Sequence, residues 1–385
     1  MRVLAFTFEA PCKLYGGGLG IVQTMTSLSS FASVDYVGPY FNVKEFPQIT
    51  LENVYFLEDN NSVPVKAWNL VRGVTTKYYQ QWKQVIRKLD PMKYDVVFID
   101  FSYNDFIMDW AHENHLKVVV RVHNIEQDMS ANSARGNVHD KYWLRNVING
   151  WVINIREKRV MDHAEHLIFL TKEDQNRACE LYGNALLSRS SIVPVCMSFP
   201  EKETVAMELP QPYVLATGAL YYGPNSEGIK WMISNVWKDI HKQLPGMSLL
   251  IAGRNPDDEL KALAENTENC VLVPSPEDIT PYFQQASLYL APIFSGAGMK
   301  VKVAEALSYG LTVIGSQHAL IGYEEAAPFC IEANTAEEFK KEILRFFAAD
   351  HNAQWQEQCR EKFCALYTMD RSAKDFEKAI VEEIN

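Results

Sequence analysis

The chain has 385 residues, of which 47% are hydrophobic, and a formal net charge of −11 at pH 7. This length predicts two or three domains, and the apolar content is ordinary for a globular protein. No apolar run reaches the roughly 18 residues of a membrane-spanning helix, and the acidic balance argues against a nucleic-acid-binding protein. The seven cysteines include no Cys-x-x-Cys pair, which favours reduced thiols in a cytoplasmic protein.

Short apolar segments alternate with helical segments along the whole chain. The predicted strands lie at 2–8, 94–100, 117–123, 166–171, 191–195, 213–219, 248–253, 270–273, 287–293, 311–315 and 329–331. Short apolar strands bounded by glycine, proline and charged helices are typical of parallel sheets that are buried on both faces. We therefore predict an α/β protein with two Rossmann-like, doubly wound parallel-sheet domains that face each other across a cleft.

A segment at about 197–212 with three prolines and little periodicity is the predicted linker. It separates an amino-terminal domain at 1–196 from a carboxy-terminal domain at 213–367. A last helix at about 368–385, which Asp370 is expected to cap, either completes the second domain or packs back on the first.

The loops that follow strands should carry the chemistry, because ligands of such sheets bind beyond the carboxyl ends of the strands. The first of them, Gly-Gly-Gly-Leu-Gly at 16–20, opens a predicted helix at 20–29. Main-chain N–H groups at Gly17 and Gly18 are able to face a phosphate or a sugar. The alternative is a tight turn without a ligand. The dinucleotide pattern is absent, because Asp35 comes too early to be its acidic residue.

His123 ends a predicted strand, in the run Arg-Val-His-Asn-Ile-Glu. A histidine at a carboxyl edge is able to bind a sugar hydroxyl or to help a proton leave an acceptor. Arg121 and Glu126 are candidates to support it, and Glu126 is also a candidate catalytic group. The alternative is a structural histidine.

The segment at 141–161 has tryptophans at helical spacing, Trp143 and Trp151. Its basic residues, with few acids facing them, are Lys141, Arg145, Arg156, Lys158 and Arg159. A basic helix with tryptophans is able to lie on an anionic membrane surface. The alternative is a long core helix with solvated charges.

Three polar or main-chain groups follow strands of the second half. Asn225 either caps a predicted helix at 226–236 or reaches the ligand. Arg254 either forms a bidentate pair with a diphosphate or lies in solvent. Main-chain groups near Val273 are candidates to recognise the edge of a base.

The most informative segment is 295–307, which lies between two predicted strands. Glycines let the main chain approach a ligand, and the start of a helix attracts an anion. The residues that the loop and the first turn of the helix offer are Gly296, Ala297, Gly298, Met299, Lys300 and Lys302. Glu305 adds a carboxylate. This combination suits a nucleotide diphosphate, with N–H and ammonium groups for the phosphates and the carboxylate for ribose hydroxyls.

Two motifs are missing from the sequence. No Asp-x-Asp pair ends a predicted strand, so we expect no metal clamp for a diphosphate and no metal site. No Gly-x-x-x-x-Gly-Lys-Ser/Thr occurs, which argues against a P-loop phosphotransferase. We expect no cofactor besides a nucleotide-sugar substrate.

Together these loops resemble those of a GT-B glycosyltransferase, most closely glycosyltransferase family 4, a retaining family that uses nucleotide-activated sugars. The resemblance is carried by 217–220, 223–231, 250–253 and 296–306. It implies a metal-independent hexosyltransferase with a UDP- or GDP-sugar donor and a carbohydrate or lipid-linked acceptor. It also implies a role in surface polysaccharide or glycoconjugate synthesis, in the cytoplasm or at the inner face of the membrane. The first domain would be on the acceptor side and the second would bind the donor.

The resemblance assigns roles to matching positions. Glu305 resembles the second glutamate of the family's Glu-x7-Glu motif, which holds the ribose, and the turn at 298–300 resembles the one that binds the diphosphate. Gly17 and Gly18 resemble the loop near the donor phosphate, and His123 resembles the histidine that contacts the donor sugar.

The sequence also departs from the family pattern. Ala297 stands where the first glutamate is expected, and Asn225 stands where a lysine is expected. Lys300, Lys302 or Arg254 would then supply the positive charge. Two other functions therefore stay open, a nucleotide-sugar epimerase of the same fold and a non-catalytic partner of a transferase that binds the nucleotide sugar.

Overall fold

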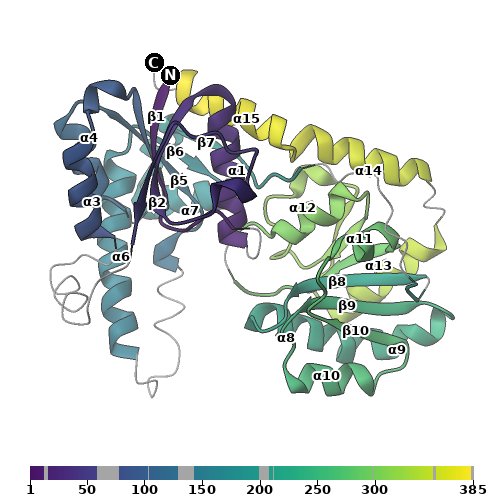
Figure 1. Cartoon of the computed structure of the whole chain (residues 1–385). Coiled ribbons are helices and arrows are strands. Elements are labelled where there is room, and N and C mark those ends of the chain that lie inside the picture. Colours follow the sequence, from purple (N-terminus) through teal and green to yellow (C-terminus); the bar gives the residue numbers. More distant parts are fainter. Residues whose placement is uncertain are drawn as a thin grey trace. The chain divides into compact units, whose positions relative to one another are not determined.

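The computed structural model divides into two compact units (Figure 1), Met1–Pro194 with Ser372–Asn385, and Val195–Arg371. We call them unit 1 and unit 2. The structure describes residues 1–12, 16–58, 78–102, 104–128, 143–198, 208–210, 212–296, 298–349 and 353–382. Most of the predicted linker, at 199–207 and 211, lies outside these residues.

The described part of unit 1 contains a seven-stranded sheet in the order β3-β2-β1-β4-β5-β6-β7, and neighbouring strands pair in parallel. The strands are β1 (Arg2–Phe6), β2 (Ser33–Pro39), β3 (Asn53–Leu57), β4 (Val96–Asp100), β5 (Lys117–Val122), β6 (His166–Phe169) and β7 (Ser190–Ile192). The sequence does not predict β2 and β3, because the buried Asp35 interrupts the apolar pattern of β2. Its carboxylate accepts hydrogen bonds from Arg2, Asn53 and Tyr94.

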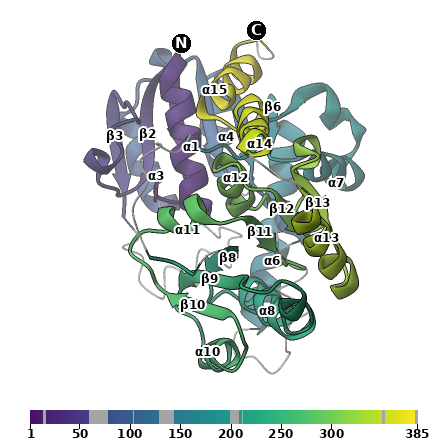
Figure 2. The same ribbon diagram turned by 90° about the vertical axis from the view of Figure 1, so that its right-hand side faces the viewer.

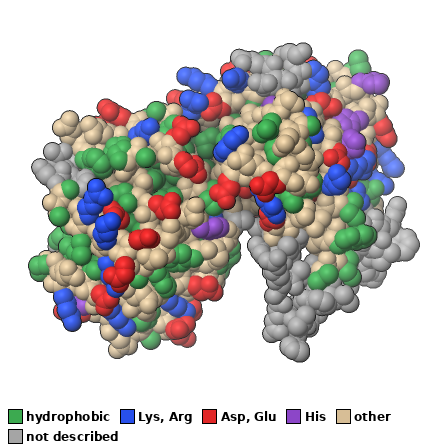
Figure 3. Space-filling model, turned by 180° about the vertical axis from the view of Figure 1, so that it is seen from behind, with side chains coloured by type: hydrophobic (Ala, Val, Ile, Leu, Met, Phe, Trp, Pro, Cys, Tyr) green, Lys and Arg blue, Asp and Glu red, His purple; other side chains and the backbone are tan. Residues whose placement is uncertain are grey.

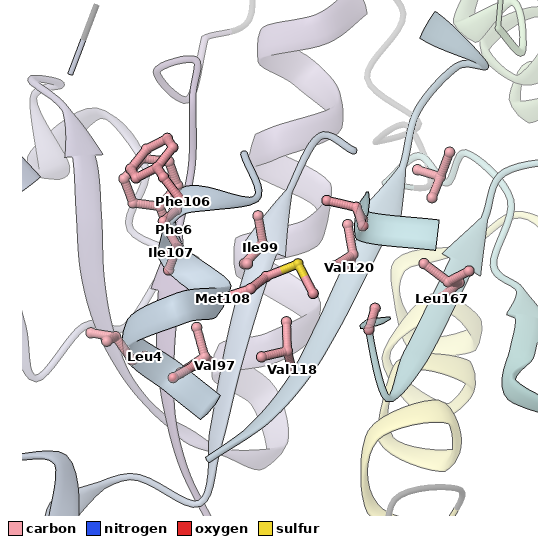
Figure 4. Close-up of a cluster of buried hydrophobic side chains, with 14 of the residues drawn as sticks. Leu4, Phe6, Val97, Ile99, Phe106, Ile107, Met108, Val118, Val120 and Leu167 are labelled. Carbon is pink, nitrogen blue, oxygen red and sulfur yellow. The ribbon is translucent and has the colours of Figure 1, made fainter. Parts of the chain in front are cut away.

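Helices cover both faces of this sheet. They are α1 (Gly16–Phe31), α3 (Tyr79–Val85), α4 (Phe106–Glu113), α6 (Trp143–His163), α7 (Lys172–Tyr182) and, near the carboxyl end, α15 (Met369–Glu377) with the π-helical turn η8 (Lys378–Glu382). One face packs on α3, α4, α6 and α7, as Figure 4 shows for Phe6, Ile99 and Met108. The other face packs on α1 and on Phe376 and Ile380.

The last helical segment begins differently from the prediction. Helix α15 starts at Met369, and the Thr368 hydroxyl, 3.4 Å from the Arg371 main-chain nitrogen, accepts its hydrogen bond. Asp370 lies inside the first turn, so its prediction as the cap was wrong. From Ser372 on the chain belongs to unit 1, where the Ser372 hydroxyl is 3.1 Å from that of Ser27 on α1, and the two helices lie side by side (Figure 2).

Unit 2 contains a six-stranded sheet in the order β10-β9-β8-β11-β12-β13, also parallel. Its strands are β8 (Tyr213–Ala219), β9 (Ser248–Arg254), β10 (Cys270–Pro274), β11 (Leu288–Ala291), β12 (Val313–Gly315) and β13 (Cys330–Glu332). Strand β11 is shorter than predicted. Pro292 has no N–H to continue the ladder, and the next N–H, of Ile293, turns back to the carbonyl of Ala291 at 2.9 Å.

The helices of unit 2 follow the strands in the doubly wound pattern. They are α8 (Gly223–Met232), which continues through the π-helical turn η5 (Ile233–Trp237) into α9 (Lys238–Ile240), then α10 (Asp258–Glu265), α11 (Thr280–Gln285), α12 (Val301–Ser308), α13 (Ala336–Ala348) and α14 (Ala353–Leu366). Helix α13 begins with a capping box, in which the Thr335 hydroxyl and the Glu338 carboxylate each bond the other residue's main-chain N–H.

The described strands of unit 2, numbered within their own sheet, have the order 3-2-1-4-5-6, and unit 1 has the same order with β7 added after β6. This confirms the predicted fold class of two doubly wound parallel sheets. In each sheet the chain first adds strands on one side of the first strand, β1 or β8, and then adds the later strands on its other side. The switch point, where this direction reverses, therefore lies between β1 and β4 in unit 1 and between β8 and β11 in unit 2. The carboxyl ends of those strands are where ligands of such sheets bind.

Candidate functional site

The glycine loop between β11 and α12 has left-handed backbone at both of its described glycines. Gly296 has φ of 96° and Gly298 has φ of 71°, which is the left-handed region that favours glycine. Lys300 is the last extended residue before α12, with φ of −87° and ψ of 96° and no side-chain cap. The N–H of Val303 bonds the Lys300 carbonyl at 2.9 Å, so the N–H groups that have no carbonyl partner in the first turn of the helix include those of Val301 and Lys302. Ala297 lies outside the described residues.

Tyr323 fixes the start of α12. Its side chain is 1% exposed. Its hydroxyl donates to the carbonyl of Lys300 at 2.8 Å and accepts from the N–H of Ala304 at 3.2 Å. The sequence does not predict this contact, because 23 positions separate Tyr323 from Lys300.

Lys302 reaches from α12 to strand β8 and to the first turn of α8. Its Nζ donates to the Asn225 Oδ1 at 2.7 Å and to the Thr217 carbonyl at 3.2 Å. A Cβ at Gly218 would lie 2.9 Å from this Nζ and 3.0 Å from the Asn225 Nδ2, so only glycine leaves room for the contact.

Asn225 is not the helix cap. Helix α8 begins at Gly223 after Tyr222, and Asn225 lies inside its first turn. Its amide donates to the Ala219 carbonyl at 3.0 Å and accepts from Lys302. The N-cap alternative was therefore wrong, and the side chain instead joins the end of β8 to α12.

Lys302 and Glu305 lie on the same helix and titrate near neutral pH. Burial lowers the pKa of Lys302 to about 7, the Lys300 charge adds to this effect, and Glu305 opposes it. Burial raises the pKa of Glu305 to about 7, against the effect of Lys302. A bound phosphate would favour the charged form of the ammonium group.

Two further groups lie around the glycine loop. The Lys300 Nζ donates to the Gly298 carbonyl at 2.6 Å. His318, in the turn after β12, lies near the carbonyls of Ser295 and Gly296. Burial and the Lys300 charge lower its pKa, and these carbonyls oppose the shift. The sequence analysis missed His318, although its place after a predicted strand was a usable signal.

Arg254 and Val273 are less tightly placed. The Arg254 carbonyl accepts from the N–H of Leu220 at 2.8 Å, and its guanidinium makes no ion pair with the side chains that the structure describes. Val273 lies in β10, the edge strand, where it pairs with Ala252.

Aromatic side chains that the sequence analysis gave no role are exposed after β8 and β11. Tyr221, Tyr222 and Phe294 are 60%, 50% and 43% exposed. The Tyr222 hydroxyl would lie 3.4 Å from a Cβ at Gly296. These rings therefore extend the glycine loop with flat apolar surface at the carboxyl edge of the sheet.

In unit 1, α1 begins at Gly16 rather than at 20, so Gly17 and Gly18 are part of its first turn. A Cβ at Gly18 would lie 2.6 Å from the Cβ of Cys12, and the Cys12 N–H bonds the Gly18 carbonyl at 3.2 Å. Packing by itself requires this glycine.

His123 is buried beside Asp100. Its Nε2 lies 2.5 Å from the Asp100 Oδ1, and its ring stacks on Phe101 with centroids 4.5 Å apart. Arg121 faces elsewhere, with its guanidinium 4.7 Å from the centre of the Phe376 ring. Asp100 was missed, although it ends a predicted strand.

Glu126 belongs to a cluster of carboxyl groups. The Glu157 side chain, which is fully buried, accepts from the main-chain N–H groups of Glu126 and Gln127 at 2.8 and 2.9 Å. Burial, Glu157 and Glu9 together raise the pKa of Glu126 to about 8. Glu126 is thus able to donate a proton or a hydrogen bond at neutral pH.

Helix α6 carries exposed apolar side chains along one stripe. Ile148, Trp151 and Ile155 are 38%, 66% and 49% exposed. The expectation that its basic residues face few acids was wrong for three of them. Asp105 pairs with Arg156 and Arg159, at 2.8 and 3.1 Å, and Asp162 pairs with Lys158. Lys141 and the side chains of Trp143 and Arg145 lie outside the described residues.

On the face of the molecule in Figure 3, lysine and arginine side chains lie among aspartate and glutamate side chains. None of the described helices combines the length and the apolar character that crossing a bilayer requires. Among the described residues, no three histidine, cysteine, aspartate or glutamate side chains are grouped so that they could hold a metal ion.

Comparisons with known proteins agree with this geometry. Residues 211–349 match the model of the family described as "Glycosyl transferases group 1". A glycosyltransferase structure from Rickettsia africae superposes with a TM-score of 0.67 at 12% identity, over 100% of this chain and 98% of that one. The chain has the GT-B glycosyltransferase fold.

Two other matches extend the comparison. The GT-B chain superposes on HepE of Anabaena, solved in complex with UDP and glucose, with a TM-score of 0.69 at 11% identity over 99% of this chain and 100% of that one. It is also 22% identical over 366 residues, 90% of each chain, to an uncharacterized 44.6 kDa protein in the cps region of Klebsiella pneumoniae.

Proposed function

We propose that the chain is a retaining glycosyltransferase that moves a hexosyl group from a UDP- or GDP-sugar to a carbohydrate or lipid-linked acceptor without a metal ion. The observation that carries the proposal is the bond from Lys302 to Asn225 beside the left-handed glycine loop. It lies within the residues that match the glycosyl transferase family. The complex of HepE with UDP and glucose supports a nucleotide-sugar donor.

The site must stabilise the leaving diphosphate, because negative charge grows on the diphosphate as the sugar departs. The N–H groups at the start of α12 and the ammonium groups of Lys300 and Lys302 are proposed to stabilise that charge. Glu305 is proposed to bind the ribose hydroxyls. Tyr323 holds the helix start in place, so the groups would be ordered before the donor binds. Loss of one such donor typically costs roughly 3–4 kcal/mol.

Unit 1 is proposed to supply the groups that contact the sugars. His123 would hydrogen-bond a hydroxyl, and Glu126, whose pKa is raised to about 8, would donate a hydrogen bond. A product in surface polysaccharide or glycoconjugate synthesis is consistent with the cps-region relative and with the similar structure of WaaG, a glycosyltransferase involved in lipopolysaccharide biosynthesis.

Peripheral contact with the inner membrane surface is a further part of the proposal. The stripe of Ile148, Trp151 and Ile155 on α6 is exposed, and an apolar stripe with an interfacial tryptophan suits a lipid headgroup layer. We expect Trp151→Gln to reduce flotation of the protein with vesicles of anionic phospholipid. Met92→Gln, which changes an apolar side chain of unit 1 that is 91% exposed, is the matched control. Equal flotation of both variants and the wild type would reject the contact.

Calorimetry followed by turnover tests the main proposal. We expect UDP or GDP to bind, and Lys302→Met and Glu305→Gln to weaken that binding while both variants stay folded. With donor and acceptor together, NMR should show the donor's anomeric configuration in the product. Conversion of donor alone to an epimer would indicate an epimerase. Binding without turnover on any acceptor would indicate a non-catalytic partner, and no binding of either nucleotide would reject the donor site.

A further inference from the structure

Asp100 and His123 form a buried pair at the carboxyl ends of adjacent strands. Asp100 is the last residue of β4 and His123 follows the last residue of β5, and the two strands pair side by side. The Asp100 side chain is fully buried and that of His123 is 8% exposed. The Asp100 Oδ1 lies 2.5 Å from the His123 Nε2.

The chemistry of the carboxylate decides which ring nitrogen carries the proton. An ionised carboxylate only accepts hydrogen bonds, so the Nε2 that faces it must be the protonated nitrogen. The other carboxylate oxygen, Oδ2, has no hydrogen-bond partner in the described structure. His123 is therefore the side chain that hydrogen-bonds this buried carboxyl group in the described structure. In the neutral ring Nδ1 then holds the free lone pair.

Two neighbours hold the ring in one orientation. Phe101 has φ of 74°, an uncommon conformation for a residue with a side chain and one that recurs at functional sites. The main-chain N–H of Phe101 bonds the Arg121 carbonyl at 3.1 Å, and its ring lies nearly parallel to that of His123, at 24°. A Cβ at Gly20 would lie 3.2 Å from the His123 Cε1 and 3.6 Å from its Nδ1. The nitrogen that Asp100 leaves free thus lies beside α1.

We propose that Asp100 is a positioning residue that holds His123 with its proton on Nε2, so that Nδ1 is the nitrogen that accepts a hydrogen bond from a sugar hydroxyl. The part that concerns the sugar rests on the proposed function. The tautomer itself does not, because it is set by contacts within unit 1. In this role Asp100 orients the His123 ring and does not itself react with the sugar.

The tautomer is measured by long-range proton–nitrogen NMR on the ligand-free, uniformly nitrogen-15-labelled full chain. His123→Gln identifies the His123 signals by their loss. At a pH where the ring is neutral, we expect the proton on Nε2 in the wild type and a loss of that preference in Asp100→Asn. A wild-type ring with its proton on Nδ1 overturns the proposal.

Asp35→Asn is the matched control, because Asp35 is a buried carboxylate of the same sheet that bonds Arg2, Asn53 and Tyr94 rather than a histidine. We expect it to lower stability and to leave the His123 signals unchanged. If the Asp100→Asn signals change only as much as those of Asp35→Asn, the tautomer is not set by Asp100 and the proposal fails.

Turnover gives the second measurement. A single lost hydrogen bond costs up to about tenfold, so we expect Asp100→Asn to lower kcat by about tenfold with a much smaller change in donor KM. Wild-type kcat in Asp100→Asn, with the Nε2 tautomer confirmed, overturns the catalytic part of the proposal. If the wild type transfers no sugar at all, the proposed function fails while the NMR result still decides the tautomer.

Discussion

The Nζ of Lys302 lies 2.7 Å from the Oδ1 of Asn225, 77 residues away in the sequence. This bond joins the start of α12 to the first turn of α8, at the switch point of the sheet. It places a positive charge where the sequence has an asparagine in the position of an expected lysine. The positive charge is thus supplied by Lys302, in the connection from β11 to β12, and not by a residue in the connection from β8 to β9.

Asn225→Asp tests this relationship directly. A carboxylate in place of the amide should raise the pKa of Lys302 and compensate its charge, so we expect UDP or GDP to bind about tenfold more weakly, or about 1.4 kcal/mol. Calorimetry at pH 7 measures this change. Asn235→Asp makes the same charge change at an exposed residue of unit 2 whose amide bonds the Trp231 carbonyl. Equal affinity of the two variants would contradict the prediction.

Lys302→Met tests the low pKa of the ammonium group. Because that pKa is about 7 in the free protein and a phosphate raises it, binding should take up protons, and affinity should fall as the pH rises above 7. Calorimetry in two buffers with different ionisation enthalpies measures the uptake. We expect Lys302→Met to abolish it, whereas Lys261→Met, at a lysine paired with Asp258 on α10, should leave it intact. Undiminished proton uptake in Lys302→Met would assign it to another group.

Glu126→Gln should change how stability depends on pH. The pKa of Glu126 is raised from 4.5 to about 8, so between these values the folded protein binds more protons than the unfolded chain, and its stability falls as the pH rises. The variant should melt higher than the wild type at pH 8, by about 2–4 °C for each kcal/mol. The difference should vanish near pH 4.5. Glu113→Gln on α4 is the control, and parallel curves for all three proteins would contradict the shift.

Tyr323→Phe removes the hydroxyl that bonds both Lys300 and Ala304. We expect a loss of about 1–2 kcal/mol of stability, measured by denaturant unfolding, together with weaker nucleotide binding because the start of α12 loosens. Tyr213→Phe removes a hydroxyl that bonds the Tyr282 carbonyl at 2.7 Å, at the other end of the sheet. Tyr213→Phe should lose a similar amount of stability but bind the nucleotide as the wild type does. An equal loss of nucleotide affinity in both variants would contradict the role of Tyr323 in ordering the start of α12.

The repeating alternation of strands and helices, and hence the fold class, could be predicted from the sequence. Apolar strands between charged helices leave few other ways to bury both faces of a sheet. The two strands that the sequence did not predict, β2 and β3, lack this apolar pattern. Strand β2 contains the buried Asp35, whose charge is satisfied only by partners at positions 2, 53 and 94.

The glycine loop could also be predicted, because left-handed backbone at Gly296 and Gly298 is a local property. The role of Asn225 could not, because the choice between capping a helix and bonding Lys302 depends on where α12 lies. The contact of Tyr323 with Lys300 could not be predicted for the same reason, since 23 positions separate the two residues.

The order of residues by itself determined most of the strands, the glycine loop before α12, and which loops end beside a switch point, because these depend on near neighbours and on period. The tertiary structure alone decided which polar groups meet. The bonds of Lys302 with Asn225 and of Asp100 with His123 join different strands or strand connections of a sheet. The bond between the Glu126 main chain and Glu157 joins residues 31 positions apart within the connection from β5 to β6. Burial then set their protonation, since the cost of a charge depends on what surrounds it in three dimensions.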